Sequence, residues 1–199
     1  MNDQGEDRIP TRDRCLRLMD EHGMLDNIVD HSLKVTEVAL FLSRELNRKG
    51  QKIDLGVVEA ASLLHDLAKT ECLKTKEDHA EVGCERLTEM GYERIGQVVA
   101  RHIVVGKPGY DSSVSEEELV NYADKRVQHD RIVSLTERFR DLRVRYGWGE
   151  VDPGAMDRME QETYEIEQRI FSILGMDPSV LESLERRFDE EIRKRLEGR

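Results

Sequence analysis

Prolines and aromatic residues are scarce in this sequence. Only four prolines occur in 199 residues, and phenylalanine, tryptophan and tyrosine together make up 5%. Strands are enriched in aromatic and β-branched residues, whereas the leucine, glutamate and arginine that are abundant here favour helices. Apolar residues recur at helical spacing along most of the chain, and no alternating segment of useful length indicates a strand. The sequence therefore predicts an all-α protein.

Disulfide patterns, long apolar runs and an excess of positive charge are also missing. There are three cysteines without CxxC spacing, which indicates reduced thiols in a cytoplasmic protein. No apolar run approaches the roughly 18 residues of a membrane span, and the polar start of the chain shows no signal peptide. The formal net charge is −11, which argues against duplex nucleic acid or a membrane as partner. A small anionic ligand is still expected to be compatible, because a bound metal ion reverses the local field.

Turn-rich segments divide the chain into expected helices. The first five helices are expected at about 10–22, 26–49, 54–69, 78–90 and 93–102, and a loop follows at 106–113. Ser115 and Glu118 form a capping-box pattern that opens the helix containing Asp124. Turn residues near 147–153 mark a boundary, and two amphipathic helices follow at about 153–174 and 178–196. We expect a helical domain over 10–146 and a helical extension over 147–199 that packs on it. A homodimer interface is the alternative reading of this extension.

Several expected helices carry a histidine or an aspartate on their apolar face. His31 continues an apolar stripe at i+4, i+7 and i+11, and His65, His102 and Asp124 also have apolar neighbours at helical spacing. The face of His79 is less well defined. Each residue alone has an ordinary explanation, such as a core histidine bonded to a carbonyl, an ion-paired aspartate, or a surface histidine at a helix start. Five polar groups aimed inward must nevertheless be satisfied, and a metal centre satisfies them together.

The residue types indicate which metals would bind. Imidazole and carboxylate ligands without thiolates suit iron, manganese, nickel, cobalt or zinc. With Asp66 the set has four histidines and two aspartates, more than one tetrahedral ion uses, and two ions roughly 3.5–4 Å apart would use it fully. His65 and Asp66 would point about 100° apart on a helix. One of them can therefore bind a single ion while the other bridges two.

The order of these residues resembles a known family. His31, then His65-Asp66, then Asp124 resembles the H…HD…D signature of the HD-domain metal-dependent phosphohydrolases, and the similar stretches cover about residues 26–128. The two further histidines resemble the members that hold two metals, such as HD-type diadenosine tetraphosphatases, more than the mononuclear 5′-deoxynucleotidases. The chain departs from that subgroup just after His102 and in its extension past residue 147. The GYP triplet of cyclic-di-GMP phosphodiesterases is absent.

The resemblance implies an HD-domain helical bundle that hydrolyses a phosphoester or phosphoanhydride bond of a small nucleotide-like substrate. A metal-bound hydroxide would attack phosphorus. One ion would be held by His31, His65, Asp66 and Asp124, and a second by Asp66, His79 and His102, with Asp66 bridging.

Three basic residues are candidates for binding the substrate. Lys69 follows Asp66 by three residues, and the HD-x-x-K pattern of the family favours a catalytic contact with a phosphate oxygen over a solvated lysine. Lys107 and Arg126 are weaker candidates, for which an ordinary surface charge is the favoured interpretation. Two other functions stay open. One is a mononuclear nucleotidase in which His79 and His102 contact the substrate. The other is a non-catalytic HD domain that senses a nucleotide.

Overall fold

The computed structural model describes residues 8–106, 113–146 and 154–184. Within these residues the chain forms nine helices and one pair of two-residue strands. The helices are α1 (Arg12–Glu21), α2 (Asp26–Arg48), α3 (Leu55–Leu64), α4 (Lys69–Thr75), α5 (His79–Glu89), α6 (Glu93–Ala100), α7 (Glu116–Lys125), α8 (Leu135–Tyr146) and α9 (Ala155–Leu174). The strands are β1 (Val127–Gln128) and β2 (Arg131–Ile132), which pair antiparallel. The predicted all-α class is confirmed. None of the described helices is long and apolar enough to cross a bilayer.

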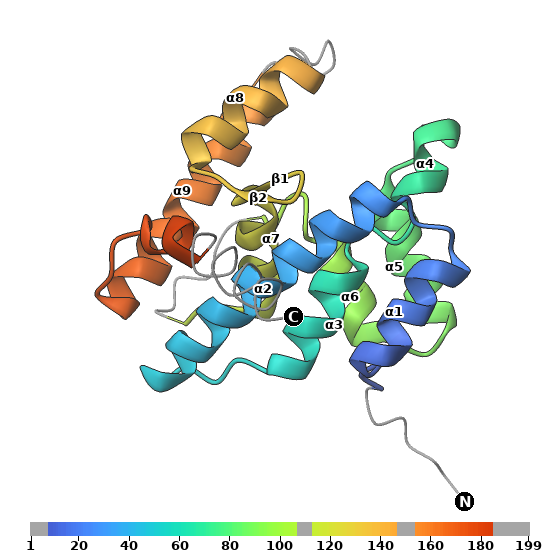
Figure 1. Ribbon diagram of the computed structural model, residues 1–199, viewed down its shortest axis with the longest axis horizontal. Coiled ribbons are helices and arrows are strands. Elements are labelled where there is room, and N and C mark those ends of the chain that lie inside the picture. Colours follow the sequence, from blue (N-terminus) through green and yellow to red (C-terminus); the bar gives the residue numbers. More distant parts are fainter. Residues whose placement is uncertain (1–7, 107–112, 147–153, 185–199) are drawn as a thin grey trace, which may run out of the picture.

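Helix α2 runs through the middle of the molecule and packs against α3 on one side and α7 on the other (Figure 1). Its inward stripe contains Val35, Val38 and Leu42, all fully buried, and His31 continues this stripe toward the helix start. The periodicity of the sequence therefore placed His31 on the correct face. Burial of this stripe provides most of the driving force that fixes α2, since fully burying one Val or Leu side chain is worth about 1.5–3 kcal/mol.

Helix α3 begins at a side-chain cap, in which Asp54 accepts hydrogen bonds from the main-chain N–H groups of Gly56 and Val57. The expected helix over 54–69 is wrong at its end, because α3 stops at Leu64 and α4 begins only at Lys69. The intervening turns are closed by i→i−3 hydrogen bonds, including that from Leu67 N–H to the Leu64 carbonyl at 3.0 Å. His65 and Asp66 therefore lie in a tight turn after the helix, and the helical angle assumed between them does not apply.

Helices α5 and α6 form an antiparallel hairpin whose close approach depends on a glycine. A Cβ atom on Gly96 would lie 2.9 Å from the carbonyl oxygen of Cys84 and 3.1 Å from the hydroxyl of Thr88. Only a hydrogen at this position allows α6 to pack directly on the α5 backbone. The hairpin carries His79 at its beginning and is followed by His102 at its end, so this contact sets the separation of two candidate ligands.

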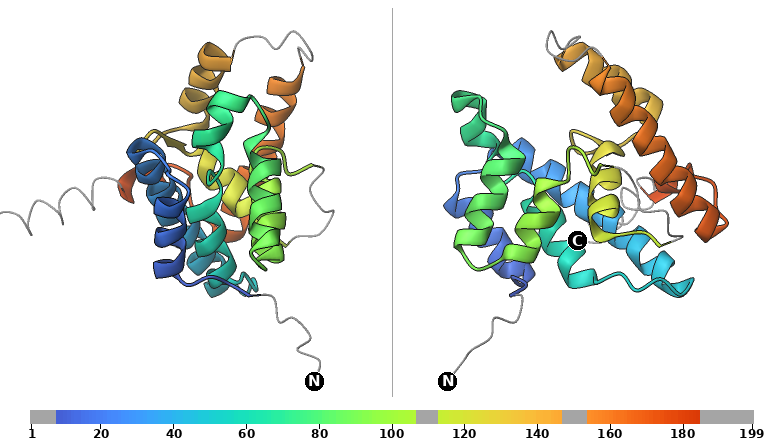
Figure 2. Two further views of the ribbon diagram at one scale, coloured as in Figure 1. Left: turned by 90° about the vertical axis from the view of Figure 1, so that its right-hand side faces the viewer. Right: turned by 180° about the vertical axis from the view of Figure 1, so that it is seen from behind.

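Helix α7 is opened by the capping box that the sequence predicts, with Ser115 and Glu118 exchanging both hydrogen bonds. Helices α8 and α9 lie side by side and project from the bundle beyond β1 and β2 (Figures 1 and 2). Helix α9 also packs on α7 through a buried apolar face that includes Ile166, Ile170 and Phe171. The division into a domain at 10–146 and an extension at 147–199 stays a prediction, as does the alternative of a homodimer. The expected helix at 178–196 lies mostly outside the described residues.

Candidate metal centre

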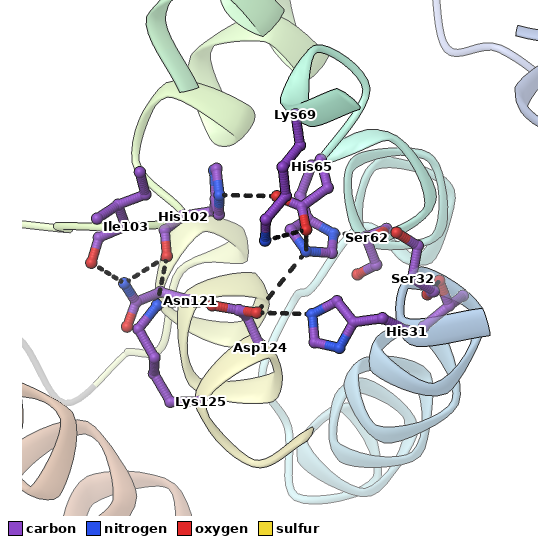
Figure 3. Close-up of polar contacts among 12 residues, drawn as sticks. His31, Ser32, Ser62, His65, Lys69, His102, Ile103, Asn121, Asp124 and Lys125 are labelled. Carbon is purple, nitrogen blue, oxygen red and sulfur yellow. Dashed lines mark hydrogen bonds and ion pairs between the residues drawn. The ribbon is translucent and has the colours of Figure 1, made fainter. Parts of the chain in front are cut away.

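Side chains from α2, α7 and the turn after α3 form a first group of potential metal ligands, namely His31, His65 and Asp124. His31 Nε2 lies 2.9 Å from Asp124 Oδ1, and His65 Nε2 lies 3.7 Å from the same oxygen. Figure 3 shows both rings directed at the Asp124 carboxylate. All three residues are buried.

A second group lies next to the first and consists of Asp66, His79 and His102. Asp66 Oδ1 is 3.1 Å from His79 Nε2 and 3.6 Å from His102 Nε2. The other oxygen of the same carboxylate, Oδ2, faces the first group and lies 3.4 Å from His65 Nε2. Two donors that share an ion at about 2.0–2.1 Å lie about 2.8–3.4 Å apart for bond angles of about 90–109°. The separations within both groups are close to these values.

Main-chain carbonyl groups orient three of the histidines. The Nδ1 atoms of His31, His65 and His102 lie 2.8, 2.8 and 2.7 Å from the carbonyl oxygens of His129, Ser62 and Val99 respectively. A carbonyl only accepts, so each Nδ1 carries a proton, and in the neutral form of each ring Nε2 presents a lone pair. This arrangement is typical of histidines that bind metals.

Burial and neighbouring charge act in opposite directions on the two aspartates. Burial would raise the pKa of Asp66, but His65 and Lys69 outweigh it and hold that pKa well below its usual range. Burial would likewise raise the pKa of Asp124, but Lys125, His31 and Arg138 bring that value well below the usual range. Both carboxylates are therefore ionised near neutral pH and available to bind a cation.

Burial and neighbouring charge shift the pKa values of His65 and His102 in opposite directions. Burial lowers the pKa of His102 to about 4, and the nearby His65 acts in the same direction, although Asp66 opposes both. Burial would also lower the pKa of His65, but Asp66 and Asp124 reverse the effect and raise it. His102 is thus neutral near pH 7, whereas the raised pKa of His65 means that a bound cation would compete there with a proton.

Two buried atoms that could ligate a metal lack hydrogen-bond partners, which supports a fit to divalent cations. Among the residues that the structure describes, no hydrogen-bond partner reaches His65 Nε2 or Asp66 Oδ1. Such unpaired buried polar atoms are destabilising, and both belong to the ligand groups. The imidazole and carboxylate donors match the chemistry of first-row divalent metals. The residues present therefore fit a divalent metal site.

Arg126 and Lys107 are the two other predicted substrate contacts. The structure corrects the prediction for Arg126, because its guanidinium is fully buried on the far side of α7. There it donates to the Val133 carbonyl, the Tyr122 hydroxyl and the Glu167 carboxylate, which ties α7 to α9. Arg126 follows Asp124 by two residues but points away from the metal groups, which its position in the sequence does not reveal. Lys107 lies outside the described residues.

Lys69 reaches the site as expected, with its Nζ 2.7 Å from Asp66 Oδ2. Two further cations escaped sequence reasoning. Lys125 Nζ donates to Asp124 Oδ2 at 2.7 Å and to the His102 carbonyl at 3.0 Å, and Arg138 Nη2 lies 3.8 Å from Asp124 Oδ1. Lys125 directly follows Asp124 in the sequence, which is the only local signal. Arg138 is brought in from α8 by the fold.

Comparison with known proteins identifies the fold family. The model for the family described as "HD domain" matches residues 28–139, more than half of the chain. An uncharacterized protein of Methanocaldococcus jannaschii is 30% identical over 132 residues, which cover 57% of this chain and 77% of that protein. No solved structure gives a significant match.

Two further relatives are tRNA (cytidine(56)-2'-O)-methyltransferases. Those of Thermoplasma volcanium and Picrophilus torridus are 28% and 32% identical over 142 and 143 residues. Each match covers 65% of this chain but only 40% of the methyltransferase. None of the three relatives is named a diadenosine tetraphosphatase, so the likeness to that subgroup stays a proposal.

The family match and the geometry agree residue by residue. His31, the His65-Asp66 pair and Asp124 all fall within the matched segment, and their donor atoms converge in space. Together they indicate a divalent metal site. The chain belongs to the HD-domain family.

Proposed function

We propose that this protein is a metal-dependent phosphohydrolase that uses two divalent ions. The observation that carries the proposal is the position of Asp66, whose two carboxylate oxygens face different ligand groups. Oδ2 lies toward His65 and Oδ1 toward His79, so the carboxylate is placed to bridge two ions. His31, His65 and Asp124 would complete one site, while His79 and His102 would complete the other.

Divalent ions bound there would lower the pKa of a coordinated water and neutralise the charge on phosphoryl oxygens. The chain itself contributes positioning and further charge. Burial would lower the pKa of Lys69, but Asp66 and Asp124 raise it, so this side chain is protonated at neutral pH. Its Nζ is placed to donate to a phosphate oxygen next to the bridging carboxylate.

Lys125 and Asn121 position His102. The Lys125 ammonium and the Asn121 amide both donate to the His102 carbonyl, at 3.0 and 2.9 Å, and Asn121 also donates to the Ile103 carbonyl. These bonds hold the segment after α6 against α7 (Figure 3). Both contacts are buried, so they restrict the segment strongly.

The proposal is tested by hydrolysis assays with a panel of nucleoside monophosphates, dinucleoside polyphosphates and simple phosphomonoesters. Manganese, iron, cobalt, nickel or zinc is added to the metal-free protein, and released phosphate is measured. Asp66→Asn is expected to abolish activity while circular dichroism shows an unchanged helix content. Asp30→Asn, an exposed aspartate on the same helix as His31, serves as the matched control and is expected to behave as wild type.

The role of Lys69 has its own pair of variants. Lys69→Met is expected to reduce kcat by about 10²-fold or more, because a charge next to the phosphoryl oxygens is lost. Lys74→Met, an exposed lysine on the same helix α4, is expected to leave kcat unchanged. Inactivity of wild type toward the whole panel with every metal would contradict an enzymatic function and favour a nucleotide-sensing HD domain.

The names of the two methyltransferases raise RNA modification as the second candidate. We rank it lower because most of each methyltransferase has no aligned counterpart in this chain. A net charge of −11 also disfavours an extended polyanion as substrate. A methyl-transfer assay with unmodified tRNA is expected to give no product. The mononuclear alternative is distinguished by metal content, as described in the Discussion.

A further inference from the structure

Two cavities open on either side of Lys69, Arg138 and Tyr146, which line both of them. The smaller cavity has a volume of about 100 Å³ and includes His31, Asp66 and further polar side chains. The larger has a volume of about 280 Å³ and reaches the opposite face of the ligand cluster through His79, His102, Asp124 and Lys125. The metal centre therefore lies at the floor of both cavities.

The outer wall of the larger cavity is apolar. Leu142 of α8 and Met156 and Met159 of α9 contribute to it, together with Ile103 after α6. Met156 and Met159 are three residues apart, so they lie on one face of α9. Both are half-buried and stay accessible from the cavity.

Most of this wall lies outside the family match. The HD-domain model ends at residue 139, whereas Leu142, Tyr146, Met156 and Met159 all follow it. The ligand cluster lies within the matched segment, so the chemistry belongs to the shared fold. Most of the residues that face it across the larger cavity come from α8 and α9, beyond the end of the matched segment.

The composition of the cavity indicates what it binds. The cations and metal ligands at its floor suit a phosphate group. The described residues of its outer wall carry no charged side chain. Methionine side chains adapt their shape and make favourable sulfur–aromatic contacts. Its volume of about 280 Å³ is close to the lower end of the roughly 300–1,000 Å³ typical of ligand pockets, which suits one nucleoside-sized group better than two.

We propose that α8 and α9 form the specificity wall of the site, in which Met156 and Met159 bind the single aromatic base of a mononucleoside phosphate. This inference rests on the proposed function for the phosphate end of the substrate and extends it to the uncharged end. Dinucleoside polyphosphates would be poor substrates, because their second nucleoside has no matching apolar cavity among the described residues.

Binding of free nucleosides tests the wall without any turnover. Adenosine, guanosine, cytidine and uridine are titrated separately into the full-length protein by calorimetry, and inorganic phosphate is titrated as the probe for the floor. At least one nucleoside is expected to bind wild type. The double variant Met156→Glu/Met159→Glu is expected to weaken that binding about tenfold or more, since a carboxylate beside an aromatic ring is poorly solvated. Phosphate affinity is compared in the uncharged variant Met156→Ala/Met159→Ala, where it should change little because no negative charge is added to the cavity.

Two controls separate a specific contact from a loss of folding. Met176→Glu changes an exposed methionine outside the cavity and is expected to bind nucleosides as wild type does. The conservative double variant Met156→Leu/Met159→Leu keeps the wall apolar and is expected to retain binding. If the double glutamate variant does not fold, Met156→Ala/Met159→Ala takes its place, with a several-fold loss expected.

The inference is overturned if none of the four nucleosides binds wild type, or if the glutamate or alanine variants bind them equally well. It is distinguishable from the proposed function because nucleoside binding needs no hydrolysis. If nucleosides bind but no phosphate ester in the panel is hydrolysed, the proposed function alone is contradicted. If a phosphate ester is hydrolysed but no nucleoside binds, only the proposed specificity wall is contradicted.

Discussion

The Nε2 atoms of His79 and His102 lie 3.2 Å apart, although one residue starts α5 and the other follows α6. The Nδ1 of His102 donates to the Val99 carbonyl, so in the neutral ring its Nε2 is unprotonated and carries a lone pair. A proton on His79 Nε2 donated to His102 would explain this contact, and so would a cation shared by the two nitrogens. The contact is therefore compatible with a second ion site, in which the cation would take the place of that proton.

The first prediction concerns the number of ions. Wild type is expected to bind two divalent ions per chain, and the double variant His79→Ala/His102→Ala is expected to bind one, because His31, His65 and Asp124 remain. Inductively coupled plasma mass spectrometry on protein dialysed against manganese measures the ratio. His22→Ala, a histidine outside the cluster, is the control. One ion in wild type would instead favour the mononuclear nucleotidase.

The second prediction concerns His129, whose main-chain carbonyl orients His31. This residue has a φ of 58° in the turn between β1 and β2, a conformation that glycine adopts readily and β-branched residues resist. His129→Gly is expected to keep the metal affinity, whereas His129→Val is expected to weaken it by about tenfold as the turn distorts. Competition with a fluorescent chelator measures both. Equal affinity in the two variants would show that the turn does not control His31.

The third prediction concerns the α5–α6 hairpin. Gly96→Ala is expected to destabilise the protein by about 1–3 kcal/mol, because the new methyl group meets the Cys84 carbonyl at 2.9 Å. Separation of the helices should also move His79 away from His102 and weaken the second ion site. Urea unfolding and metal titration measure the two effects. Gly56→Ala is the matched control, since its added methyl makes only ordinary contacts of 3.4 Å or more.

The fourth prediction concerns Arg126, which joins Tyr122 on α7 to Glu167 on α9. Arg126→Met is expected to destabilise the protein by about 3 kcal/mol, because it leaves a carboxylate and a hydroxyl without their cation. Metal stoichiometry should not change, which distinguishes this structural role from substrate binding. Arg140→Met, an exposed residue of α8, should have a small effect. A selective rise in KM with unchanged stability would instead restore the original interpretation as a substrate contact.

The fifth prediction concerns pH in the metal-free protein. Burial lowers the pKa of His102 to about 4 in the folded state, against roughly 6.5 in the unfolded chain. Between these values the unfolded chain binds a proton that the folded protein does not, so the free energy of unfolding falls as pH decreases through this window. The loss from His102 is at most about 3 kcal/mol.

His65 opposes this trend, because its pKa is raised and its protonated form contributes stability below the unfolded value. Comparison with His102→Gln isolates the contribution of His102. The stability difference between wild type and variant is expected to shrink as pH is lowered from about 6.5 to about 4. Urea unfolding with a chelator present measures it at several pH values. A constant difference would mean that His102 is not buried in its neutral form.

Helical periodicity predicted much of the fold because it is a local property. Helix α2 begins at Asp26 as expected and ends one residue before the expected end, and the cap at Ser115 forms as its residues indicate. The break after Leu64 was missed, since the apolar pattern continues through Leu67 and Ala68, both of which are buried. Hydrogen bonding of the turn, and not its hydrophobicity, decides that the helix ends there.

The sequence by itself determined the donor set, because residue type fixes which metals can bind and helical spacing fixes which faces turn inward. Only the tertiary structure decided how those donors divide into two groups, with the Asp66 carboxylate between them. It also decided that Arg126 turns to α9 while Arg138 and the methionines of α9 reach the site. Contacts between residues distant along the chain follow from packing of the whole core, and no local pattern encodes them.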